Sequence, residues 1–170
     1  MSIFEGIKCV AFDCFGTVFD MSTISREEIA AYVHHVNKLE FTPFDFPQSW
    51  YELKAHPDAK EGVELLRAKG IYCVTLSNGT WNLLTTVSND NGIKWDYVID
   101  LIGHKVYKPH YDAYRTIEKD TKFTPSETLM VTANPGFGDV EGSTVIGMQS
   151  EIIRTDRSKF KTIIDLANAF

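Results

Sequence analysis

The strongest constraint on the fold is an alternation along the chain between short apolar runs and segments with a helical repeat. The runs are rich in β-branched residues and have the length of buried strands. They lie at residues 7–12, 71–76, 97–102, 128–133 and 151–154. Such βαβ alternation predicts an α/β fold with a Rossmann-like, parallel, five-stranded sheet that is flanked by helices.

Local signals mark the helices between the runs. Asp58 and Glu61 have the spacing of a capping box ahead of one helix, and Gly70 is expected to end it. Two later segments carry apolar faces at helical spacing, and each is expected to pack on the sheet. These faces are formed by His110, Ala113, Tyr114 and Ile117, and by Phe160, Ile163, Ile164 and Ala167.

The 170 residues fit a single core domain, 1–170, with one short insertion at 20–57. Ser25 and Glu28 predict a helix start in this insertion, and apolar residues follow at 29, 33 and 36. An aromatic, proline-bearing stretch comes next. We therefore expect a small helical cap insertion after the first strand, whose aromatic residues Phe41, Phe44, Phe46 and Trp50 form a lid, bury in a homodimer or cover the sheet.

Composition excludes several classes of protein. The net charge is −6, so no nucleic acid partner is expected, although a small anionic substrate is compatible with a local site. We find neither a membrane span nor a signal peptide, and we expect a soluble cytoplasmic protein. Cys9, Cys14 and Cys73 are interpreted as reduced core thiols, with a reactive Cys14 as the alternative.

Polar residues follow the apolar runs, at the edge of a parallel sheet where ligands bind. The first four runs lead to Asp13 and Thr17, to Ser77 and Asn78, to Lys108, and to Thr132, Asn134 and Asp139. A carboxylate such as Asp13 acts as a covalent nucleophile when a cation such as Lys108 keeps it ionised. Each residue also has a structural interpretation, in which Asp13 caps a turn, Ser77 caps a helix and Lys108 lies at the surface.

Three of these segments together resemble a known family. Asp-x-Phe-Gly-Thr from residue 13, Leu-Ser-Asn-Gly from residue 76 and Val-Tyr-Lys-Pro from residue 106 are similar, in that order, to the first three motifs of the haloacid dehalogenase superfamily. The resemblance covers nearly the whole chain outside the insertion. Most phosphatases of that superfamily carry a second aspartate two residues after the nucleophile, where this chain has Phe15, and 2-haloacid dehalogenases carry an aromatic residue there.

The resemblance to dehalogenases implies a role for each motif residue. Asp13 is the implied nucleophile, with Lys108 as its charge partner, and hydrolysis proceeds through an aspartyl ester. The implied catalytic residues are Asp13, Lys108, Thr17, Ser77, Asn134 and Asp139, and the implied substrate-binding residues are Phe15, Asn78, Tyr114 and Thr132. Thr17 and Ser77 would hydrogen-bond the nucleophile, Asn78 would lie near the leaving halide, and the last two catalytic residues would hold the hydrolytic water.

Two other functions stay open. One is a magnesium-dependent phosphatase that works through an aspartyl-phosphate, with Asp13 and Asp139 as the metal ligands. The other is a non-catalytic binding protein that keeps the fold. Asn134 replaces an aspartate that often binds magnesium in the phosphatases, and dehalogenase chemistry needs no metal, so no cofactor is favoured.

Overall fold

The computed structural model describes residues 2–170. Within them, five parallel strands form one sheet in the order β3-β2-β1-β4-β5. The strands are β1 Cys9–Phe12, β2 Tyr72–Thr75, β3 Tyr97–Val98, β4 Thr128–Thr132 and β5 Gln149–Ile152. The predicted α/β class and the parallel five-stranded sheet are confirmed.

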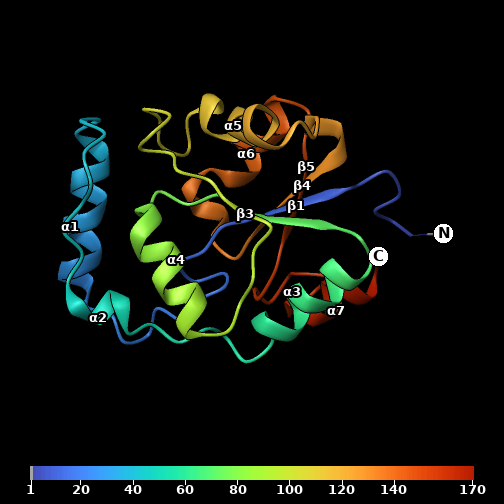
Figure 1. Ribbon diagram of the computed structural model, residues 1–170, viewed down its shortest axis with the longest axis horizontal. Coiled ribbons are helices and arrows are strands. Elements are labelled where there is room, and N and C mark those ends of the chain that lie inside the picture. The colour runs from blue at the N-terminus through green and yellow to red at the C-terminus, as the bar shows by residue number, and fades with distance from the viewer. Residues whose placement is uncertain (1) are drawn as a thin grey trace.

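Helices cover both faces of the sheet, as Figure 1 shows. The helices are α1 Arg26–Asn37, α2 Gln48–Tyr51, α3 Ala59–Ala68, α4 Trp81–Asp90, α5 Tyr111–Thr121, α6 Asp139–Val145 and α7 Ile163–Asn168. Successive side chains of a strand point to opposite faces. Accordingly, Val10 and Phe12 pack with residues of α3 and α7, whereas Cys9 and Ala11 pack with residues of α5.

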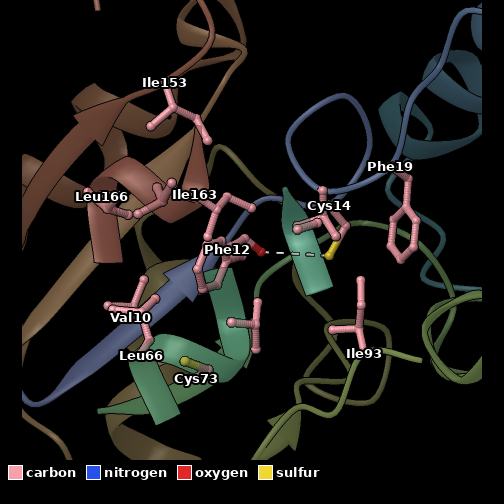
Figure 2. Packing of buried hydrophobic residues seen from close by; sticks show 14 of the residues in the cluster. Val10, Phe12, Cys14, Phe19, Leu66, Cys73, Ile93, Ile153, Ile163 and Leu166 are labelled. Carbon is pink, nitrogen blue, oxygen red and sulfur yellow. Dashed lines mark hydrogen bonds between the residues drawn. The ribbon is translucent and has the colours of Figure 1, made fainter. Parts of the chain in front are cut away.

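The three cysteines are free and buried. Figure 2 shows Cys14 and Cys73 within the apolar core on the α3 and α7 side of the sheet, and the thiol of Cys14 donates to the Phe12 carbonyl oxygen at 3.7 Å. Burial raises the pKa of Cys9 to about 12. Burial also raises the pKa of Cys14, and the nearby carboxylate of Asp13 adds to this effect. The structure therefore agrees with reduced core thiols.

Strand ends differ from the prediction by one or two residues in most strands, and two strands differ most. The run at 97–102 forms a strand only at Tyr97 and Val98, because Asp100 then turns the chain by accepting a hydrogen bond from the Gly103 backbone N–H. Ile99 and Leu101 are fully buried although they lie outside the strand. The last strand begins two residues earlier than predicted, at Gln149, because a strand at the sheet edge tolerates polar residues.

The predicted capping box at Asp58 and Glu61 is wrong. Helix α3 does begin after Asp58, but the aspartate side chain makes no capping hydrogen bond. Its two oxygens instead accept from the Arg154 guanidinium at 2.9 and 3.0 Å, and one also accepts from the backbone N–H of Ile163 at 2.7 Å. Both partners of Asp58 therefore lie far along the chain from it. Arg154 also donates to the Thr17 carbonyl oxygen at 2.9 Å.

The two predicted apolar helix faces are each one residue too long. His110 is exposed and caps α5 by accepting the backbone N–H of Asp112, whereas Ala113, Tyr114 and Ile117 are buried as expected. Phe160 packs in the core but precedes α7, which begins at Ile163.

The insertion forms α1, α2 and irregular segments, and α1 lies at the left margin of Figure 1. Ser25 caps α1 as predicted by accepting the Glu28 backbone N–H at 3.1 Å. Phe46 and Trp50 pack with Tyr32 and Phe15 inside the same chain, so these aromatic side chains need no second subunit to be buried. The boundaries 20–57 and the homodimer remain predictions.

The part of the chain that the structure describes contains no helix with the length and apolarity needed to cross a membrane.

Candidate active site

The carboxylate of Asp13 lies just beyond the end of β1 and is surrounded by hydrogen-bond donors. Its Oδ2 accepts from Thr17 Oγ1 at 2.9 Å, from Asn134 Nδ2 at 2.7 Å and from Thr132 Oγ1 at 3.4 Å. Its Oδ1 accepts from Lys108 Nζ at 3.0 Å. Neighbouring strands β1 and β4 end side by side, and this juxtaposition brings donors from distant parts of the sequence onto one carboxylate.

Lys108 holds two carboxylates together. Its ammonium lies 3.0 Å from Asp13 and 3.2 Å from Asp139, and the lysine side chain is only 9% exposed. Burial alone would lower the pKa of Lys108, but the two carboxylates outweigh it and raise that pKa above its ordinary value. Lys108 is therefore charged in the folded protein.

Asp139, at the start of α6, is almost completely buried. Burial raises its pKa, the ammonium of Lys108 opposes this, and Asp13 adds to the increase. Tyr114 donates from its hydroxyl to Asp139 Oδ1 at 2.8 Å. Burial, together with the charge of Asp139, raises the pKa of Tyr114, so the tyrosine remains a neutral donor.

Asn78 positions the lysine loop. Its side-chain oxygen accepts the Lys108 backbone N–H at 2.8 Å, and its Nδ2 donates to the Lys108 carbonyl oxygen at 3.1 Å. The predicted hydrogen bond from Ser77 to Asp13 is absent among the described residues. Ser77 Oγ instead accepts the Gly79 backbone N–H at 3.1 Å, because the turn after β2 brings this N–H back to the serine.

Close backbone approach at two glycines allows this assembly. Gly16 has φ +86°, and a β-carbon there would lie 3.2 Å from the side-chain amide of Asn134, which itself donates to the Phe15 carbonyl oxygen. In α6, a β-carbon on Gly142 would collide with the ring of Tyr114. Side chains at these positions would displace the groups that contact Asp13 and Asp139.

A cavity of about 320 Å³ opens onto these groups. Its polar side is formed by Asp13, Ser77, Asn78, Lys108, Asn134 and Asp139. Phe15 also lines it, as predicted for a substrate-binding residue. Tyr114 and Thr132 are also predicted to bind substrate, but they are not among the described residues that line the cavity. Tyr114 contacts Asp139 instead, and Thr132 contacts Asp13.

No family model matches the chain, but individual proteins that are similar to it are dehalogenases. The chain is 27% identical to an (S)-2-haloacid dehalogenase of Xanthobacter autotrophicus over 83% of this chain and 72% of that enzyme. It is 28% identical to haloacetate dehalogenase H-2 of Moraxella sp. (strain B) over 60% of this chain and 46% of that enzyme. The Xanthobacter L-2-haloacid dehalogenase with chloropropionic acid covalently bound superposes with a TM-score of 0.74 and 23% identity, over 89% of this chain and 79% of the other.

The chain is thus similar in sequence and in fold to 2-haloacid dehalogenases, which are members of the haloacid dehalogenase superfamily. The curated relatives that it matches are named haloacid dehalogenases, which are hydrolases. The structural likeness establishes the same fold. The three motifs found in the sequence supply Asp13, Asn78 and Lys108, and all three residues line the cavity.

The cavity also has lining residues that the sequence interpretation missed. Tyr32 and Val36 of α1 line the cavity, as does Met21. Tyr32 also contacts Phe15 edge to face, with ring centroids 5.9 Å apart. The signal was present in the spacing of Ile29, Tyr32 and Val36, which places all three on one side of a helix. Nothing in that spacing tells which element the face meets.

The magnesium ligands proposed for the phosphatase alternative do not fit a metal ion. Asp13 and Asp139 share the ammonium of Lys108, and Asn134 directs its Nδ2, not its oxygen, toward Asp13. A cation that replaced this arrangement would have to displace the lysine. Residues 2–170 contain no group of three or more His, Cys, Asp or Glu side chains arranged to hold a metal ion.

Proposed function

We propose that the chain hydrolyses the carbon–halogen bond of small 2-haloacids, with Asp13 as the nucleophile. The observation that carries this proposal is the environment of Asp13, in which three neutral donors fix one oxygen and a buried ammonium faces the other. A carboxylate held this way is aligned for nucleophilic attack. Likeness to the dehalogenases of Xanthobacter and Moraxella supports the choice of reaction.

The first step is displacement of halide. A carboxylate oxygen has about two lone-pair sites, and three donors already contact Oδ2 of Asp13. Oδ1 accepts a hydrogen bond from Lys108 and has a lone pair to spare, so it is the attacking atom. A bond forms between Oδ1 and the carbon that bears the halogen, the carbon–halogen bond breaks, and the halide leaves with the electron pair. The product is an ester of Asp13.

The second step is hydrolysis of that ester. Water adds its oxygen to Cγ of Asp13, and the bond between Cγ and the ester oxygen breaks. Asp139 lies beside the site with a raised pKa, so it is the group that accepts a proton from water and passes it to the departing alkoxide. The balance is a 2-haloacid and water converted into a 2-hydroxyacid, a halide ion and a proton. Asp13 is regenerated as a carboxylate.

A side-by-side substrate screen tests this proposal against both alternatives. We expect halide release from 2-chloropropionate in the presence of excess chelator, and no phosphate release from aryl phosphate esters with or without added magnesium. The physical reason is that Lys108 already supplies the positive charge between the two carboxylates. Ion chromatography measures halide, and a colorimetric assay measures phosphate.

Each alternative has its own outcome in this screen. Phosphate release that depends on added magnesium would favour the phosphatase. An inert protein with a cooperative melting transition would favour the binding protein. Both results would contradict the proposed function.

A further inference from the structure

The cavity above Asp13 has two chemically different sides. Its polar side follows the carboxyl ends of the strands and contains the reacting groups. Its opposite wall comes from the insertion and is formed by Met21, Ile29, Tyr32, Val33, Val36 and Trp50. A ligand that reaches Asp13 therefore also meets the apolar face of α1, the helix at the left margin of Figure 1.

Charge contributes little to holding an anionic substrate here. Lys108 is the one cationic residue among the described residues that line the cavity, and its ammonium already contacts Asp13 and Asp139. With two carboxylates and one ammonium, the lining residues carry a net negative charge. Most of the binding free energy must then come from burial of apolar surface.

The size of the cavity exceeds that of the smallest haloacids. If each non-hydrogen atom takes roughly the volume of a water molecule, about 30 Å³, then 320 Å³ holds about ten such atoms. Chloropropionate has about six non-hydrogen atoms, so it leaves space for roughly four more. This space lies against the wall formed by α1, where water makes few hydrogen bonds.

We propose that the site prefers 2-haloacids with an unbranched apolar substituent of about four carbons, such as 2-chlorohexanoate, over haloacetate and 2-chloropropionate. This inference rests on the proposed function and adds the substrate class. Each further methylene group buried against α1 contributes about 0.8 kcal/mol, which is roughly fourfold in kcat/KM. The conformational entropy that the alkyl substituent loses on binding offsets part of this gain.

The test is the rate of halide release along a series of chloroacetate, 2-chloropropionate, 2-chlorobutanoate and 2-chlorohexanoate. We expect kcat/KM to rise along the series, by at least about tenfold from propionate to hexanoate. Halide release with a flat or falling series would overturn this inference alone. No halide release from any member would overturn the proposed function, and the inference with it.

A substitution in the wall formed by α1 tests where the alkyl substituent of the substrate binds. Val33 lines the cavity and is 37% exposed, so Val33→Phe fills space without disturbing a tightly packed core. We expect it to lower the hexanoate-to-propionate ratio of kcat/KM by about tenfold, with a melting temperature near that of the wild type. Val145→Phe is the matched control, on exposed surface of α6 away from the cavity. A ratio that changes equally, or in neither variant, would contradict the role of α1.

Discussion

The Asp13→Asn variant is expected to lose turnover by at least about 10⁴-fold while it keeps its fold. The amide is nearly the same size as the carboxylate, so the packing around β1 is preserved. It is a poor nucleophile because its lone pair is delocalised and it carries no charge. The loss should appear in kcat for halide release, measured beside the wild type at equal concentration.

Asp90→Asn makes the same chemical change at an exposed position at the end of α4, and it serves as the control. It should retain wild-type kcat. Melting curves of both variants should stay cooperative. Substantial turnover in a well-folded Asp13→Asn protein, with deamidation back to aspartate excluded by mass spectrometry, would rule out Asp13 as the nucleophile.

Lys108→Ala is expected to lower kcat/KM by about 10²- to 10³-fold, the range seen when one preorganised charge or donor is removed. Without the ammonium, Asp13 and Asp139 face each other across a mostly buried site. Lys108 is the charge that opposes the increase in the pKa of Asp139, so its removal raises that pKa further. A protonated Asp139 cannot accept a proton from the hydrolytic water.

The pH dependence distinguishes this mechanism from simple damage. In Lys108→Ala, activity should rise as pH increases, because Asp139 loses its proton and can again accept one from water. Lys94→Ala, at an exposed position, should follow the wild-type profile. A pH-independent loss in Lys108→Ala, accompanied by aggregation or a non-cooperative melt, would indicate that the lysine has only a structural role.

Much of the core fold could be predicted because its signals are local. The run that becomes β4 consists of apolar or β-branched residues, and every residue of that strand is buried. The apolar run at 97–102 also suggests a strand along its whole length, but only Tyr97 and Val98 form one. Ile99 and Leu101 are buried, yet both lie outside the strand, on either side of Asp100, which begins a turn. Apolar character reports burial and does not by itself distinguish a strand from a buried turn.

Long-range contacts explain the other differences. Asp58 has the local pattern of a helix cap, but Arg154 and the Ile163 backbone N–H lie far along the chain and occupy its oxygens. A charged guanidinium is a stronger partner than a local backbone N–H. No pattern within a few residues of Asp58 contains that information.

Part of the candidate site could likewise be predicted from local motifs, and part depends on long-range contacts. Motif order indicated that Asp13, Lys108 and Asp139 would meet, because all follow parallel strands that end at one edge. The contacts of Ser77 and Asn78 depend on the paths of their loops, which the motifs leave open. The apolar wall depends on how the insertion folds back over that edge, and no strand-end rule describes it.

The destination of the water oxygen tests the central claim most directly. In a single turnover in heavy-oxygen water, with enzyme in excess over 2-chloropropionate, water should attack Cγ of the Asp13 ester. Trypsin then releases residues 9–26, which contain Asp13. Tandem mass spectrometry should find one heavy oxygen on Asp13, none on Asp20 of the same peptide, and an unlabelled hydroxyl in the lactate product. Label in the lactate hydroxyl with none on Asp13 would mean that water attacks the substrate carbon, and it would contradict an aspartyl-ester mechanism.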